Sequence, residues 1–254
     1  MRDNLYKIIW IVGMFLTLIL ILAMMMTYKI KYQDSIYYKY LYFYNCNDDI
    51  CATTKEKQIE DKSMIYSVYK YRKKMPTFNK INNEYVKIYD NNDVVLYNIH
   101  NKVLTKNYVD YSIINTNNTI FKAVTKDKLC GLINSNGKKI TGLIYDDFKT
   151  YNNEVIAAIY KGKYGSITLD GKKTYIEFEY DYIEIFDDII ITVKDNLLDI
   201  INTDKESLLS DKIEVADVNN LSLNKDDNVI NIKITNKDGF DEYKFDVVEK
   251  KLNN

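Results

Sequence analysis

The chain opens with one uninterrupted run of apolar residues, from Ile8 to Met26. At a rise of about 1.5 Å per residue, a helix of this length extends about 28 Å, which matches the hydrocarbon core of a bilayer. We therefore predict a transmembrane helix over residues 8–28, preceded by a short tail of residues 1–7, with the lipid bilayer as its first partner.

Two alternatives to a membrane span are a cleaved signal peptide and a buried core helix. The run is longer than the roughly 7 to 15 apolar residues of a signal peptide, and the segment Ala23 to Tyr28 offers no small-x-small cleavage site. No later segment of the chain is apolar enough to surround a core helix. The pattern favours an uncleaved signal anchor.

Beyond the anchor the apolar positions alternate with a period of two. Between Tyr37 and Tyr44, tyrosines at the even positions alternate with Leu41 and Phe43 at the odd positions, which predicts a strand. We expect this strand to be buried on both faces rather than to display an aromatic surface. With the polar stretch Asn45–Lys62 it forms a juxtamembrane connector over residues 29–62.

The centre of the chain repeats itself at intervals of 34 to 35 residues. The recurring positions are Gly131, Gly137, Lys138, Tyr145 and Asp146 in one copy, and Gly165, Gly171, Lys172, Tyr180 and Asp181 in the next. Such a period is typical of stacked supersecondary units with degenerate units at the ends. We predict a β-repeat domain over residues 63–254, with clear units at 128–162 and 163–196. A fainter copy begins at Asn117-Asn118.

Each unit is predicted to be a β-hairpin followed by another strand. Asn136-Gly137 and Asp170-Gly171 are strong hairpin signals, because both central residues tolerate positive φ. The apolar runs Val155–Tyr160 and Ile189–Val193 predict the later strands. The soluble part is therefore expected to be all-β, an array of stacked hairpin repeats behind one N-terminal helix.

This unit resembles the WG repeat of bacterial proteins, in which a Trp-Gly pair, a Gly-Lys turn and a Tyr-Asp pair follow one another. Cys130-Gly131 and Tyr164-Gly165 stand at the Trp-Gly positions, so neither copy keeps the tryptophan. A segment from Met75-Pro76 onwards matches the second half of an earlier unit. The resemblance implies a membrane-anchored bacterial member with a β-rich scaffold, and it carries over no catalytic residue.

Three cysteines bear on compartment and chemistry. Cys46 and Cys51 are close enough in sequence to close a small disulfide loop in an oxidising compartment, or they are incidental thiols. With one histidine in the chain and no second cysteine pair, a four-ligand zinc site is not expected. The net charge of −1 gives no sign of a nucleic-acid footprint.

Further candidate chemistry is better explained by turn structure. The segment Gly131 to Lys138 has five residues between its glycines where a phosphate loop has four. His100 occupies a turn position, and the pairs Asp146-Asp147 and Asp187-Asp188 lie in turns, where aspartate bonds its own backbone. We predict no catalytic residue, no cofactor and no metal.

The function expected from these features is a membrane-tethered, non-enzymatic interaction module for a protein or a surface polysaccharide. An envelope enzyme or enzyme accessory, with a site assembled across repeats, is an alternative, and a purely structural surface protein is another. Arg2 and Lys7 precede the helix while Lys29, Lys31 and Lys39 follow it, which slightly favours a cytoplasmic domain. The short basic tail and the cysteine pair favour the outside, which we adopt.

Overall fold

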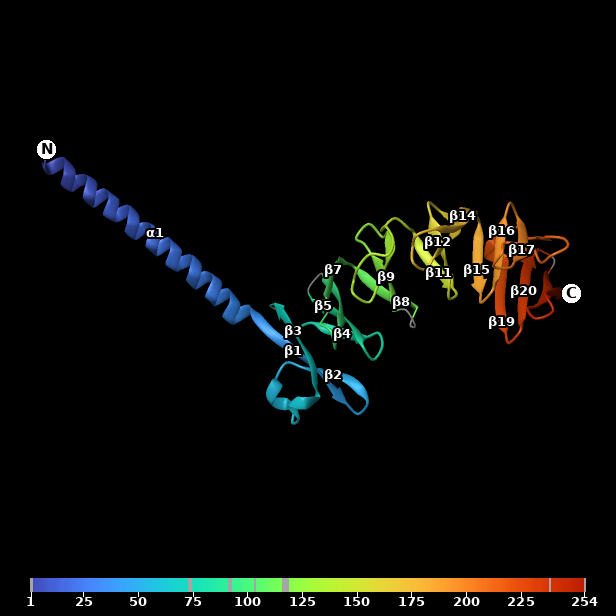
Figure 1. Cartoon of the computed structure of the whole chain (residues 1–254), viewed down its shortest axis with the longest axis horizontal. Coiled ribbons are helices and arrows are strands. Elements are labelled where there is room, and N and C mark those ends of the chain that lie inside the picture. The colour runs from blue at the N-terminus through green and yellow to red at the C-terminus, as the bar shows by residue number, and fades with distance from the viewer. Residues whose placement is uncertain are drawn as a thin grey trace. The chain divides into compact units, whose positions relative to one another are not determined.

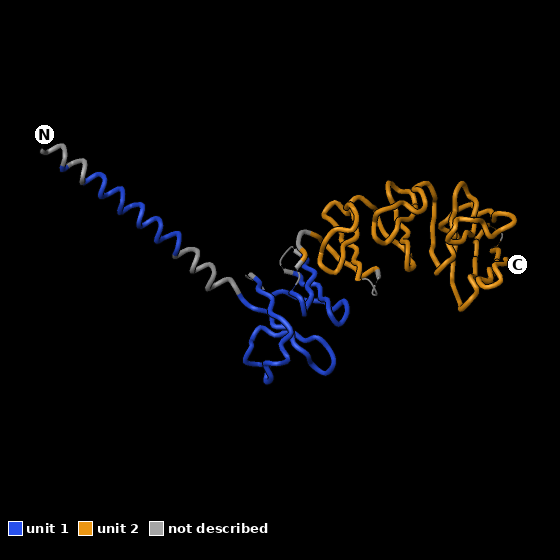
Figure 2. Tube along the Cα trace, in the orientation of Figure 1, with its two compact units in different colours: residues 1–102 blue, residues 103–254 orange. Residues whose placement is uncertain are grey.

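The computed structural model describes residues 2–72, 75–90, 93–102, 104–115, 119–237 and 239–253. The predicted copy at Asn117-Asn118 begins outside these residues. The chain divides into two compact units, Met1–Lys102 and Val103–Asn254 (Figure 2). One helix comes first and small antiparallel sheets follow it (Figure 1), so the predicted all-β array behind an N-terminal helix is confirmed.

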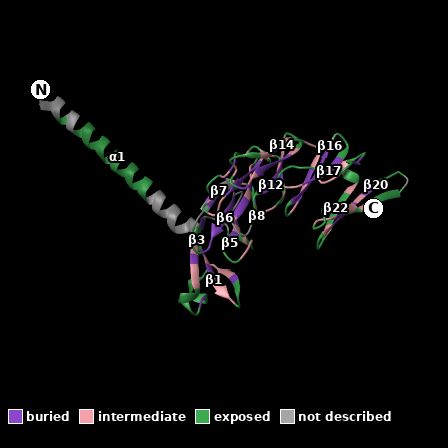
Figure 3. Ribbon diagram, turned by 45° about the vertical axis from the view of Figure 1, so that its right-hand side comes forward, coloured by how far each residue is buried: buried purple, intermediate pink, exposed green. Residues whose placement is uncertain are grey.

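Helix α1 (Arg2–Tyr37) contains the apolar run and is longer than the predicted span. Its segment Trp10–Thr27 has a mean hydropathy of 2.4, and its side chains are exposed (Figure 3). The hydroxyl of Thr17 donates to the carbonyl of Gly13 at 3.1 Å, so this polar side chain is satisfied within the helix. The helix is long and apolar enough to cross a membrane. A signal sequence near the N-terminus would meet the same criterion of length and composition.

The first unit continues with two sheets. One has the order β2-β1-β3, with β1 (Tyr38–Cys46), β2 (Asp49–Thr53) and β3 (Ile65–Arg72), and short 3-10 helices η1 (Glu56–Gln58) and η2 (Lys62–Met64) between the last two. The other includes β4 (Thr77–Lys80), β5 (Tyr85–Asp90) and β6 (Asp93–Asn98). Phe43 packs between them, with its ring centroid 5.4 Å from those of both Phe78 and Tyr97.

The expectation that the tyrosine-rich strand is buried on both faces is wrong. Leu41 and Phe43 on β1 are buried in the cluster shared with β5 and β6. On the opposite face Tyr40 is 44% exposed, and Tyr42 and Tyr44 are half-buried. A phenol ring tolerates this position because its hydroxyl remains in water while its body covers the strand.

The second unit begins with β7 (Leu104–Tyr108) and continues through four sheets, which we call C, D, E and F in chain order (Figure 1). Sheet C contains β8 (Asp110–Asn115), β9 (Ile120–Val124) and β10 (Cys130–Ile133). Sheet D contains β11 (Asp147–Tyr151), β12 (Val155–Tyr160), β13 (Lys163–Thr168) and β14 (Thr174–Tyr180).

Sheet E contains β15 (Tyr182–Phe186), β16 (Ile189–Lys194), β17 (Leu197–Ile201) and β18 (Ile213–Glu214). A short 3-10 helix, η3 (Val218–Asn220), leads to sheet F, which contains β19 (Leu221–Asp226), β20 (Val229–Asn236), β21 (Gly239–Asp246) and β22 (Lys251–Asn253). Strands next to each other in the chain pair antiparallel within every one of these sheets.

The inner strands are continuous apolar runs because both of their faces are covered. On β12, Ile156 belongs to the cluster between sheets C and D, while its neighbour Val155 belongs to the cluster between D and E. On β16, Ile190 faces sheet D and Ile191 faces sheet F. Successive side chains of a strand point to opposite faces, so each inner strand joins the sheet before it to the sheet after it.

The sequence units and the sheets are out of phase by half a unit. Sheet D takes β11 and β12 from residues 128–162, and β13 and β14 from residues 163–196. The Asp170-Gly171 hairpin therefore connects the third and fourth strands of a sheet. In sheet C the corresponding fourth strand is reduced to two bridges, Ile133–Lys139 and Cys130–Tyr145.

Candidate functional site

Three hairpin tips of the second unit recur at intervals of 34 residues. We call them the first tip (Asn134–Lys139), the second tip (Thr168–Lys173) and the third tip (Asn202–Ser207). In each, the N–H of the fourth residue donates to the carbonyl of the first, at 2.8, 2.8 and 3.0 Å respectively. The third tip thus has the same backbone structure as the first two, although its sequence has diverged.

The residue at the fourth position of each tip has positive φ. The values are +72° at Gly137, +70° at Gly171 and +66° at Lys205. A left-handed conformation costs an L-residue about 1 to 2 kcal/mol, which explains the glycine in the two clear copies. Lys205 was not predicted as the third member, because the sequence reads Lys205-Glu206 where the two clear copies have Gly-Lys.

Each of these three residues lies close to a residue about 30 positions earlier in the chain. A Cβ on Gly137 would lie 1.9 Å from the side chain of Thr105, and one on Gly171 would lie 2.7 Å from the carbonyl oxygen of Ile140. At the third tip the ammonium of Lys205 lies 4.7 Å above the ring of Tyr175. The tips are therefore stacked in close succession.

A pocket of about 1070 Å³ opens between the first and second tips, and we call it the tip pocket. Its apolar lining consists of Ile120, Ile140 and Leu169, of which Ile120 and Leu169 are buried. Its charged lining consists of Lys138, Lys139, Glu154, Asp170, Lys172 and Lys173. The structure thus brings the two Gly-Lys steps of the repeat, distant in sequence, to one site.

The charges of the tip pocket do not cancel. Lys172 forms an ion pair with Asp170, with 3.0 Å between Nζ and Oδ2. The hydroxyl of Thr168 donates to Asp170 at 2.6 Å, and this bond, with that from Lys172, holds the pKa of the carboxyl well below its ordinary value. Among the described residues, no carboxylate pairs with Lys138, Lys139 or Lys173. Four lysines and two carboxylates leave an excess of positive charge.

The Tyr-Asp positions of the repeat stabilise the sheets rather than the pocket. Asp146 accepts a hydrogen bond from the N–H of Gly162 at 2.8 Å, in the turn between β12 and β13. Asp181 accepts from the N–H of Asp195 at 3.2 Å, in the turn between β16 and β17. The Nζ of Lys163 also contacts Asp181 at 2.6 Å and is the main cause of the lowered pKa of its carboxyl.

The tyrosines and the other glycines of the repeat also have structural roles. Tyr145 packs against Phe148, Tyr160 and Phe178, with ring centroids 5.0 to 6.1 Å apart. A Cβ on Gly165 would lie 2.7 Å from the ring of Phe178. A Cβ on Gly131 would lie 2.5 Å from the carbonyl oxygen of Gly142. The Nζ of Lys194 lies 5.7 Å from the centre of the Tyr180 ring.

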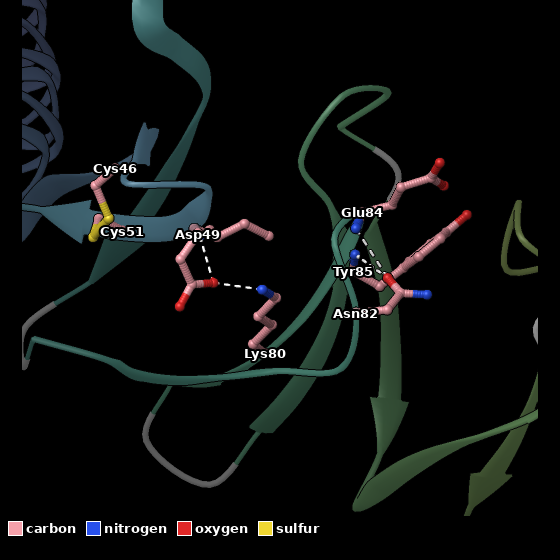
Figure 4. A network of polar contacts seen from close by, with 8 residues as sticks. Cys46, Asp49, Cys51, Lys80, Asn82, Glu84 and Tyr85 are labelled. Carbon is pink, nitrogen blue, oxygen red and sulfur yellow. Dashed lines mark hydrogen bonds and ion pairs between the residues drawn. A yellow bond between two sulfur atoms is a disulfide. The ribbon is translucent and has the colours of Figure 1, made fainter.

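The cysteine pair lies in the first unit, at the turn between β1 and β2. Cys46 and Cys51 are joined by a disulfide, with Cα atoms 5.8 Å apart, an ordinary separation (Figure 4). Beside it, a hydrogen bond from Lys80 lowers the pKa of the Asp49 carboxyl, and the N–H of Ile50 contributes further. Asn82 accepts from the N–H groups of Glu84 and Tyr85, both at 2.9 Å (Figure 4).

The remaining cysteine and the histidine have structural surroundings. Cys130 is buried, and burial raises the pKa of its thiol to about 11. Its Sγ donates to the carbonyl of Tyr145 at 3.4 Å. His100 lies in the turn after β6, where its N–H donates to Asn98 at 2.9 Å and its ring packs on Tyr66.

In each of the two acidic pairs, one aspartate forms an ion pair with lysine. Asp147 contacts Lys122 at 2.8 Å and Lys149 at 2.7 Å. Burial raises the pKa of the Asp147 carboxyl, but the hydrogen bonds from both lysines outweigh it and the net shift is downward. Asp187 is paired with Lys225. Within the described part of the chain, no three His, Cys, Asp or Glu side chains form a group that could hold a metal ion.

No family model matches the chain, and no curated protein matches it. Solved structures that the chain resembles include a eukaryotic initiation factor, with a TM-score of 0.48 and 8% identity over 82% of this chain and 61% of that one. The WD40 domain of SCAP from fission yeast has a TM-score of 0.35 and 11% identity over 82% and 64%.

A third structure, the dihydro-heme d1 dehydrogenase NirN, has a TM-score of 0.38 and 10% identity over 85% of this chain and 53% of that one. The chain therefore spans less than two thirds of the length of each of these three proteins.

Proposed function

We propose that the chain is a membrane-tethered, non-enzymatic interaction module whose ligand binds at the tip pocket. The observation that carries this proposal is the convergence of two equivalent Gly-Lys steps on one pocket. Three of the pocket's lysines, Lys138, Lys139 and Lys173, form no ion pair with a carboxylate among the described residues. Repeat arrays commonly bind extended partners along a surface that is built from equivalent positions of neighbouring units.

The tether is α1. Its exposed apolar segment has nothing to pack against in the described part of the chain, and in water it would expose a continuous hydrophobic surface. Insertion into a bilayer removes that surface from water at a gain of about 25 cal/mol per Å². We further propose that the repeats are degenerate WG units and that the array lies outside the cytoplasm, where the Cys46–Cys51 disulfide is stable.

Quantitative pull-down from detergent-solubilised membranes tests the binding role. The test variant Lys139→Glu with Lys173→Glu reverses two exposed, equivalent lysines of the pocket. Its matched control, Lys250→Glu with Lys251→Glu, makes the same change of charge on two exposed lysines at the end of sheet F. We expect partner recovery to fall for the pocket variant alone. Failure to recover any partner, or equal loss in both variants, would contradict the proposal.

Labelling of intact cells with a membrane-impermeant maleimide tests the side of the membrane. Because Cys130 is buried and its thiol pKa is raised, the reagent reports on Cys46 and Cys51. We expect labelling after treatment with an impermeant reductant and none before it. Cys46→Ser with Cys51→Ser should abolish this signal, and Cys130→Ala should leave it unchanged. Absence of labelling both before and after reduction would contradict an external array.

A further inference from the structure

We infer that the ligand of the tip pocket is an extended acidic peptide segment that presents carboxylates to the lysines and an aliphatic side chain to the apolar floor. This inference rests on the proposed function, because it names the class of partner at the same site.

The charges select an anionic ligand. The ammonium groups of Lys138, Lys139 and Lys173 have no carboxylate partner among the described residues and line one cavity. Like charges that share a pocket repel one another, and an anionic ligand relieves this repulsion. Glu154 and Asp170 also line the pocket, so a ligand of moderate charge density, with carboxylates spaced along a chain, suits it better than a compact polyanion.

The uncharged polar groups of the tips are largely engaged within their own turns. The side-chain oxygen of Asn134 accepts from the N–H groups of Asn136 and Lys138, at 3.0 and 2.9 Å. The hydroxyl of Thr168 donates to Asp170 at 2.6 Å. Recognition therefore depends on the lysine ammonium groups, and charge-assisted hydrogen bonds from these groups prefer carboxylates to amides.

The apolar floor of the tip pocket favours a peptide over an acidic polysaccharide as the ligand. It is formed by Ile120, Ile140 and Leu169, and none of the described residues that line the pocket is aromatic. A branched aliphatic floor offers no flat ring for a sugar to lie against, whereas it can bury a leucine, isoleucine or valine side chain of a ligand. Full burial of such a side chain is favourable, and an acidic peptide can supply both aliphatic and carboxylate groups.

Fluorescence anisotropy with the full chain in a non-ionic detergent tests this assignment. The probe is a labelled oligopeptide of repeated Glu-Leu-Glu-Ser, compared with repeats of Gln-Leu-Gln-Ser and Glu-Ser-Glu-Ser, with polygalacturonate as a competitor. We expect the Glu-Leu-Glu-Ser peptide to bind at least about tenfold more tightly than its glutamine counterpart and severalfold more tightly than the leucine-free peptide. Added salt should weaken it steeply.

The two double variants designed for the pull-down also show whether the peptide binds at the tip pocket. Lys139→Glu with Lys173→Glu should weaken binding of the acidic peptide about tenfold, and Lys250→Glu with Lys251→Glu should not change it. Equal affinity for the glutamine peptide, or equal weakening in both variants, would overturn the inference. If polygalacturonate bound more tightly than every peptide, the ligand class would be wrong while the interaction module remained. Failure of all probes would overturn the inference, and the pull-down would still decide the proposed function separately.

Discussion

At the scale of single residues, position four of each tip decides whether neighbouring units can stack. Gly171 combines two constraints, a φ of +70° and a close approach to the carbonyl oxygen of Ile140. Gly162 has a similar φ of +75°, but no atom lies within 4 Å of the Cβ that an alanine would add. Alanine variants at the two positions therefore distinguish the free-energy cost of positive φ, which both share, from the cost of the close contact, which only Gly171 has.

We predict that Gly171→Ala destabilises the second unit more than Gly162→Ala does. The left-handed conformation costs each variant about 1 to 2 kcal/mol, and overpacking adds a further 1 to 3 kcal/mol, roughly, at Gly171 alone. Urea unfolding of the full chain in detergent measures the difference. Equal losses of unfolding free energy would show that the contact with Ile140 is not a constraint.

At the third tip the opposite substitution can be made, because Lys205 is a non-glycine residue with positive φ that can be replaced by glycine. Replacement by glycine relieves the cost of its φ of +66° but removes the contact of its ammonium with the Tyr175 ring. The two effects are each about 1 kcal/mol and opposite in sign, so we expect Lys205→Gly to leave the unfolding free energy nearly unchanged. Lys205→Ala keeps the strain and loses the contact, so it should be less stable than Lys205→Gly. The reverse order of stability would contradict this account.

At the scale of elements, the pairing of Asp147 with Lys122 and Lys149 connects β11 to β9. Because the folded-state pKa of Asp147 lies below its ordinary value of 3.8, the ionised form contributes stability above that value. The contribution is lost as the pH falls through the lower folded-state pKa. Partial exposure of the pair limits its size to about 1 kcal/mol.

We therefore expect Asp147→Asn to lose about 1 kcal/mol of unfolding free energy at neutral pH, and this difference from the native chain to be smaller at pH 2, below the ordinary pKa of 3.8. Denaturant titrations at both pH values measure it. Asp188→Asn is the control, since Asp188 is exposed in a turn. A loss that persisted unchanged at low pH would show that the carboxylate charge is not its cause.

The strands and turns were largely predictable because their signals are local. The run Val155–Tyr160 is β12 with the same bounds, and both turn pairs at Gly137 and Gly171 close hairpins. The stacking of the tips was not predictable from local pattern, since nothing in the sequence near Gly171 indicates that Ile140 lies against it. The tip pocket was missed for the same reason, although its Lys138 and Lys172 had been identified as repeat positions.

At the scale of the second unit, stability resides in apolar clusters between consecutive sheets. One cluster lies between sheets C and D, another between D and E, and a third between E and F. Each sheet therefore depends on its neighbours in the chain and not on a common centre. Such nearest-neighbour coupling is the energetic property that defines repeat arrays.

Ile190 and Ile191 on β16 make this coupling testable, because they are fully buried neighbours that face opposite clusters. Truncation of either to alanine should cost about 2 to 5 kcal/mol. We expect hydrogen exchange in the Ile190→Ala variant to lose protection in β12 as well as in sheet E, because its cluster includes Val155 and Ala157. The Ile191→Ala variant should instead lose protection in β20, where Ile230 and Ile232 share its cluster. If both variants gave the same exchange pattern, the second unit would unfold as one cooperative body, and the coupling between sheets would have to be global.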